Sequence, residues 1–141
     1  MLLRTTEPKW LRWVWAAGAG LLWVHALIAF SEFYQWSFTV AFAETARQTF
    51  ELTGWQSGAG LYANFVYGIA WTADAGFLWL KGWRRYRQRQ TWLTVVVHGY
   101  LGFIVFNGTV VFGDGPIRWF GVVVFGWLAV CVQIAIKRMR L

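Results

Sequence analysis

Four apolar runs dominate this chain, and each is long enough to cross a lipid bilayer. They cover residues 10–31, 60–80, 91–112 and 117–136. A helix needs about 20 residues to cross a hydrocarbon core of about 30 Å. The runs are continuous rather than alternating, and a backbone in lipid must pair its polar groups internally. The pattern therefore predicts four transmembrane helices.

The composition favours a membrane protein over a soluble domain. Hydrophobic residues make up 58% of the 141 positions and charged residues only 13%, whereas soluble domains contain about 25% charged residues. A chain this short has too much surface for its volume to bury so many apolar side chains away from water. The single cysteine, Cys131, excludes an intrachain disulfide framework and a cysteine-based zinc site.

Basic residues predict the orientation of the helices. All 13 Lys and Arg residues except Arg47 and Arg118 lie at the start of the first run, between the second and third runs, or after the fourth. Such segments stay in the cytoplasm, so both termini are expected on the cytoplasmic side of the cell (inner) membrane. The join KGWRRYRQRQ interleaves cations with aromatic residues, a pattern compatible with RNA or anionic lipid. Its position favours a topology signal resting on anionic headgroups, with no nucleic-acid partner.

The long connection between the first two runs predicts a further helix over residues 38–53. Its apolar face contains Phe42, Ala46 and Phe50, and its charged face contains Glu44, Arg47 and Glu51. Such a helix is expected to lie at the outer membrane interface. The other joins are short and make neighbouring helices antiparallel. We therefore expect an all-α integral membrane protein, one membrane domain over residues 1–141, with an up-down four-helix bundle and this interfacial helix.

Asp74 is the only acidic residue well inside an apolar run. A mid-membrane Asp costs about 2.5 to 3.5 kcal/mol, so it needs a partner or a wet cavity. Counted from the cytoplasmic side, Asp74 and His98 each lie about seven residues into consecutive runs, or roughly 10 Å deep. We expect them to form a hydrogen-bonded inner cluster. Because an imidazole changes its charge near neutral pH, this pair predicts a pH-responsive site.

Asp74 also belongs to a stripe of polar and aromatic residues. Asn64, Tyr67 and Trp71 share its helical face at about 100° per residue. Such a stripe lines a water-filled path or hydrogen-bonds a neighbouring helix. If the stripe only locks helices together, an Asp74→Asn variant should fold and function normally, because the amide is close in size.

A second polar cluster is expected nearer the outside, formed by His25, Asn64 and Asn107. In the third run, His98 and Asn107 are nine residues apart and therefore point in opposite directions. One of them is expected to face a partner subunit. We accordingly expect a homo-oligomer or a place among other membrane subunits.

Three functions remain open on these residues. The leading one is a non-enzymatic membrane protein that binds or passes a small solute or protons through Asp74 and His98. The second is a redox anchor holding haem b between His25 and His98, with Gly18 and Gly102 leaving room, although the helical rise places His25 ~10 Å further out than His98. The third is a purely structural subunit. No HExxH spacing and no nucleophile turn is present, so no catalytic or metal site is predicted.

Overall fold

The computed structural model describes residues 9–139 of the chain, with side chains from Trp10 to Ile134. Most of these residues are helical and none is in a strand, so the prediction of an all-helical fold is confirmed. Three helical stretches, Trp10–Glu32, Thr91–Val111 and Gly115–Ile134, are long and apolar enough to cross a membrane, consistent with a multi-pass membrane protein. Two cations used to predict the orientation, Arg4 and Arg140, lie outside the described residues.

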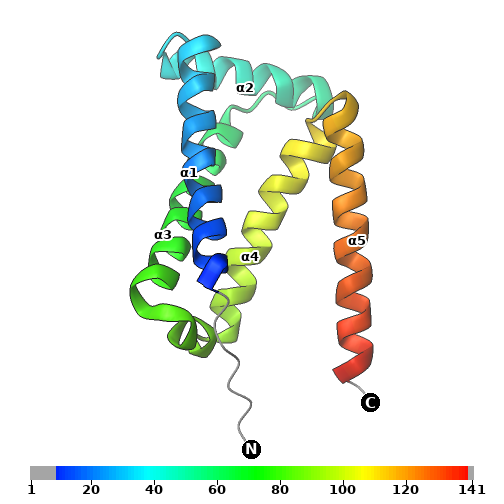
Figure 1. The fold of residues 1–141 in the computed structure, drawn as a ribbon. Helices are drawn as coiled ribbons and strands as arrows, with labels where there is room; N and C mark the ends of the chain where they lie inside the picture. Colours follow the sequence, from blue (N-terminus) through cyan, green and yellow to red (C-terminus); the bar gives the residue numbers. More distant parts are fainter. Residues whose placement is uncertain (1–8, 140–141) are drawn as a thin grey trace, which may run out of the picture. The chain divides into compact units, whose positions relative to one another are not determined.

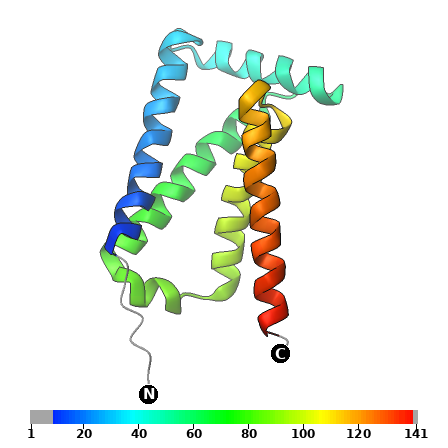
Figure 2. The ribbon, with the colours of Figure 1, turned by 45° about the vertical axis from the view of Figure 1, so that its right-hand side comes forward.

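The chain divides into two compact units after Leu101. The first contains α1 (Lys9–Glu32), α2 (Phe38–Thr53), α3 (Ala59–Gln88) and most of α4 (Thr91–Phe106). The second contains the end of α4, the π-helical turn η1 (Asn107–Val111) and α5 (Gly115–Met139). Within the first unit, α1 and α3 lie side by side and run antiparallel, and α2 extends sideways from the end where the two helices are connected (Figures 1 and 2).

Two tryptophan rings fill the interface between α1 and α3, and each lies against a glycine of the opposite helix. Trp71 of α3 covers Gly18 of α1, where an added Cβ would stand 2.5 Å from the ring. Trp23 of α1 covers Gly68 of α3, where the corresponding distance is 2.9 Å. The Trp23 indole N–H also donates to Thr72 Oγ1 at 2.8 Å. Because small residues let membrane helices approach closely, these two glycines set the spacing of α1 and α3.

α2 occupies the residues where the amphipathic pattern predicts a helix. The Ser37 hydroxyl accepts a first-turn backbone N–H at 3.4 Å, and Gly54, with φ of 74°, ends the helix. On the charged face, Arg47 pairs with Glu44 at 2.6 Å and with Glu51. The hydrogen bonds from Arg47 lower the pKa of Glu44 to about 2. The charged residues of this face therefore pair with one another, along the exposed side of the helix.

α3 continues past the predicted end at residue 80. The helix bends at a kink at Gly82 and then resumes. This residue has φ of 76° and ψ of 162°, a backbone that glycine adopts without steric cost. Residues 83–88 form a further short helical segment that turns away from the axis of α3 (Figure 2). The join between the second and third predicted spans is thus mostly helical, and it leads directly into α4 at Thr91.

In the second unit, α5 packs against η1. Thr109 and Val110 lie over Gly121 of α5, where an added Cβ would stand 2.6 Å from Thr109 Oγ1. The rings of Phe106 and Phe125 meet edge to face, with centroids 5.2 Å apart. Most other large apolar side chains of α5 are exposed, which suits a helix surrounded by lipid.

Candidate functional site

Asp74 is buried, and three donors reach its carboxylate. The side chain belongs to a residue that is only 5% exposed. Trp15 Nε1 donates to Oδ2 at 2.9 Å, and the Tyr86 hydroxyl donates to the same oxygen at 2.7 Å. Arg89 forms an ion pair with Oδ1. Because a buried ion is tolerated only when it is paired and hydrogen-bonded, these partners explain how the carboxylate is accommodated.

The kink at Gly82 brings Tyr86 and Arg89 back to Asp74. In a straight helix, a residue 15 positions further on would stand about 22 Å away along the axis. After the kink, Tyr86 and Arg89 lie on one face, with the guanidinium carbon 4.1 Å from the centroid of the phenol ring. The Arg89 side chain is 7% exposed, and its Nε donates to Thr94 Oγ1 at 2.8 Å. Arg89 is therefore buried, although the sequence assigns it to the cytoplasmic surface.

His98 joins the network through Tyr86 and Arg89. Its Nε2 lies 3.2 Å from the Tyr86 hydroxyl, and its Nδ1 lies 3.2 Å from a terminal nitrogen of Arg89. Since the Tyr86 proton is donated to Asp74, its hydroxyl oxygen is placed to accept a hydrogen bond from an N–H at Nε2. The roles of the two ring nitrogens depend on the tautomer of His98. Asp74 and His98 are therefore connected through two other side chains, not by the direct hydrogen bond that the sequence suggests.

Nδ1 of His98 faces an acceptor as well as a donor. The Thr94 carbonyl oxygen lies 3.0 Å from this nitrogen. In the neutral ring with its proton on Nε2, Nδ1 accepts from Arg89, and in the protonated ring its N–H donates to Thr94. Nδ1 of His98 thus lies within hydrogen-bond distance of both a donor and an acceptor.

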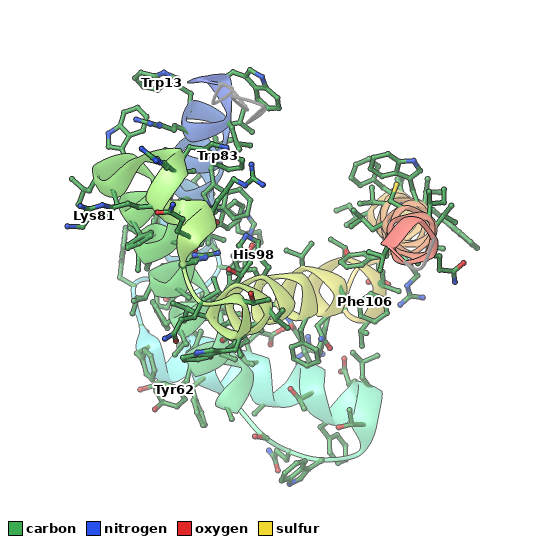
Figure 3. The ribbon with its side chains drawn as sticks, turned by 90° about the horizontal axis from the view of Figure 1, so that it is seen from below. Trp13, Tyr62, Lys81, Trp83, His98 and Phe106 are labelled. Carbon is green, nitrogen blue, oxygen red and sulfur yellow. The ribbon has the colours of Figure 1, made fainter. Side chains whose placement is uncertain are left out.

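Aromatic rings cover the network on the side of α1. Trp15 stacks on His98, with centroids 5.8 Å apart and ring planes 14° apart, and it also contacts Trp71 at 5.2 Å. Tyr67 meets Trp71 edge to face at 5.6 Å. Figure 3 shows His98 on the side of α4 that faces this part of the first unit. Tyr67 and Trp71 form an aromatic wall beside Asp74, and in the described part of the chain Trp71 Nε1 is buried without a hydrogen-bond partner. Their expected role, in lining a water-filled path or in joining helices, stays a prediction.

The residues of the expected outer cluster belong to two different units of the chain, so this cluster stays a prediction. His25 and Asn64 lie in the first unit and are exposed, and neither has a hydrogen-bond partner among the described residues. Asn107 lies in the second unit, where its amide donates to the Phe103 carbonyl of the preceding helical turn at 2.8 Å. Asn107 therefore satisfies its amide within its own helix.

The geometry does not fit a haem held by His25 and His98. Axial ligation needs a free ring nitrogen on each imidazole, and both nitrogens of His98 already lie at hydrogen-bond distance from side chains. Gly18, which could leave room for a macrocycle, is covered by the ring of Trp71. Within the described residues, no group of three or more His, Cys, Asp or Glu could hold a metal ion.

Four members of the network escape sequence reasoning: Trp15, Tyr86, Arg89 and Thr94. One signal could have found two of them. A carboxylate in an apolar run requires a cation, and the basic join contains a glycine at position 82 that permits a sharp bend. Tyr86 and Arg89 both follow that glycine. They are three residues apart from each other, which places them on one helical face.

Known proteins provide no analogy for this site. No family model matches the chain, and no curated protein or solved structure matches it either.

Proposed function

We propose that this chain is a non-enzymatic membrane protein that takes up and passes protons at the network of Asp74, Tyr86, Arg89 and His98, here called the inner network. The observation that carries the proposal is the position of His98 Nδ1 between a donor and an acceptor, at one end of a hydrogen-bonded chain that reaches a buried carboxylate. A proton is favoured over a larger solute because the polar groups of the inner network already satisfy one another. Only a proton can be exchanged there without breaking the Asp74–Arg89 pair.

The proposed step uses only groups of the chain. A proton arriving at His98 adds an N–H at Nδ1, which donates to the Thr94 carbonyl and displaces the N–H of Arg89. The ring then carries a positive charge beside the guanidinium, and the Asp74 carboxylate offsets this charge through the Tyr86 hydroxyl. Loss of the proton restores the first arrangement.

We also propose that the membrane is crossed four times, by α3 in addition to the three helical stretches that are long and apolar enough. α3 contains 23 residues from Ala59 to Lys81, a length of about 34 Å at the helical rise. It lies alongside α1 (Figure 1), so that a membrane crossed by α1 is also crossed by α3. Two of its polar side chains are paired within the first unit, Thr72 with Trp23 and Asp74 with Trp15, Tyr86 and Arg89. We propose that α2 lies at the outer interface and that both termini are cytoplasmic.

Reporter fusions at two points distinguish four spans from three. With four spans, a fusion after Gln90 and a fusion at the C-terminus are both expected to show cytoplasmic activity, because α3 returns the chain across the membrane. A fusion after Gly54 is expected to show periplasmic activity and serves as the internal reference. Periplasmic activity at the first two points would mean that α3 does not cross the membrane.

Proton passage is expected to depend on His98 but not on His25. In proteoliposomes with an internal pH-sensitive dye, a His98→Gln variant is expected to lower the proton flux by at least about tenfold, because the ring nitrogen that exchanges the proton is removed. A His25→Gln variant makes the same chemical change at an exposed position outside the inner network, and it is expected to leave the flux unchanged. Equal fluxes in the two variants and the unaltered protein would contradict the proposal.

A purely structural subunit is the second candidate, and one observation favours it. The Asp74–Arg89 pair and the Arg89–Thr94 hydrogen bond tie α3, the turn after Gly82 and α4 together. A structural subunit would show no proton flux in the unaltered protein, while its variants would change only assembly. In either case we propose that the chain works as a homo-oligomer or with other membrane subunits, since exposed polar side chains such as His25 and Asn64 in its apolar helices would prefer a protein neighbour to lipid.

A further inference from the structure

A basic surface lies on the outer side of the segment around Gly82. The inner side of the same segment contributes Tyr86 and Arg89 to the inner network. We define the basic surface by Lys81, Arg84 and Arg85, which are all exposed. Arg89 of the same turn points the other way and is buried in its ion pair. The sequence contains no Asp or Glu between positions 75 and 113. The basic surface therefore concentrates positive charge without a nearby acidic residue in its own part of the sequence.

Tryptophans border this basic surface. Trp13 and Trp79 meet edge to face with centroids 4.7 Å apart, and they are 66% and 42% exposed. Trp83 follows the kink and stacks on Tyr86. Figure 3 shows Trp13, Lys81 and Trp83 at the same end of the first unit. Exposed indoles concentrate at the level of lipid headgroups and glycerol, so the cations beside them stand at the depth of the phosphates.

The kink at Gly82 changes the direction of the backbone that carries the cations of the basic surface. Residues 83–88 run sideways relative to the rest of α3 (Figure 2), so that the backbone of Arg84 and Arg85 does not continue along the axis of α3. The guanidinium of Arg12 also reaches this point, 3.5 Å from the position that a Cβ on Gly82 would take. The arrangement presents guanidinium groups to a plane of anions, and guanidinium is the side-chain group that binds phosphate most directly.

We propose that the basic surface is a binding site for the phosphate groups of anionic phospholipids. The bordering tryptophans contact the glycerol and the upper acyl chains of the same lipids. This site is distinct from the inner network and does not depend on proton passage. The two are physically linked, however, because one helical turn carries Arg84 and Arg85 outward and Arg89 inward. Bound lipid is therefore expected to hold that turn in place and to raise the thermal stability of the protein.

The test is a lipid titration of the purified protein in a neutral detergent. Phosphatidylglycerol added in mixed micelles is expected to raise the unfolding midpoint, whereas phosphatidylcholine is not. An Arg84→Gln/Arg85→Gln variant is expected to need a roughly 25-fold higher phosphatidylglycerol concentration for half of the shift, about fivefold for each cation removed. An Arg84→Lys/Arg85→Lys variant keeps both charges and is expected to stay within about fivefold of the unaltered protein.

The matched control removes the same number of charges elsewhere. An Arg47→Gln/Arg118→Gln variant, read against its own midpoint without lipid, is expected to respond to phosphatidylglycerol like the unaltered protein. Equal weakening in the two Gln double variants would overturn the proposal, as would an equal shift with phosphatidylcholine. A larger shift with a single-stranded RNA oligonucleotide at the same salt concentration would also overturn it, in favour of nucleic acid. If Arg84→Gln/Arg85→Gln does not fold, Lys81→Gln alone is expected to weaken the lipid response about fivefold, and no change would count against the site.

Discussion

Replacing Asp74 by Asn is expected to lower the free energy of unfolding by about 3–5 kcal/mol, the usual cost of removing one partner of a buried ion pair. The amide is close in size to the carboxylate, and sequence reasoning alone would expect it to be tolerated wherever the residue merely joins helices. The structure changes this expectation, because the Arg89 guanidinium is 7% exposed and pairs with Asp74. Asn would leave its charge buried and unpaired. The measurement is reversible unfolding in mild detergent or mixed micelles.

A double variant identifies the unpaired charge as the cause. Asp74→Asn/Arg89→Gln removes both charges and is expected to be more stable than Asp74→Asn alone, since an apolar or neutral pair avoids the uncompensated ion. Glu44→Gln is the matched control: it removes one carboxylate from an exposed ion pair on α2, and surface pairs contribute little. If Asp74→Asn is as stable as the unaltered protein, or if the double variant is no better than the single one, the ion pair does not stabilise the fold.

A Gly18→Val substitution is expected to destabilise the protein by about 1–3 kcal/mol, the usual range for overpacking. Even the Cβ of the new residue would stand 2.5 Å from the ring of Trp71. That ring is held on other sides by Trp15 and Tyr67, so it cannot move aside freely. We expect α1 and α3 to separate, which also weakens the Trp15–Asp74 hydrogen bond. The unfolding midpoint in detergent measures this effect.

Gly20 provides the control for Gly18 on the same helix. An added Cβ at Gly20 has no atom within 4 Å, so Gly20→Val changes the helix propensity equally without a steric conflict. It is expected to change the free energy of unfolding by less than about 1 kcal/mol. Equal losses in the two variants would show that the β-branched side chain, and not the contact with Trp71, is responsible.

The helices could be predicted from the sequence because lipid imposes a simple rule on length and polarity. Continuous apolar runs and short joins place α1, α5 and the stretch formed by α4 and η1 within a few residues of their ends. The spacing of apolar and charged residues also places α2. The end of α3 could not be predicted in this way, because Gly82 bends the helix and lets it continue through a strongly basic segment. Hydropathy reports where apolar residues stop, and it does not report where the backbone turns.

Residues of the candidate site could be predicted from the sequence only where their depth along the helix was the deciding feature. The equal depths of Asp74 and His98 follow from the helical rise, and both lie in the inner network. Arg89 and Tyr86 were beyond such reasoning, because their approach to Asp74 depends on one pair of backbone angles at Gly82. The outer cluster was predicted from the similar depths of its residues alone, and it stays a prediction. Depth does not determine the direction of a side chain, and Asn107 turns to a carbonyl of its own helix.

The partners of Asp74 also bear on how this protein enters the membrane during synthesis. Trp15 is made 59 residues before Asp74, and Arg89 is made 15 residues after it. When the segment around Asp74 first reaches the translocation machinery, Arg89 is still inside the ribosomal exit tunnel and cannot yet pair with it, and Asp insertion alone is unfavourable. If α3 spans the membrane as proposed, we expect it to become a stable membrane helix only once α1 is already in the bilayer and Arg89 has left the ribosome. The partners of Asp74 on both sides in the sequence would then make α1, α3 and the segment after Gly82 insert as one unit.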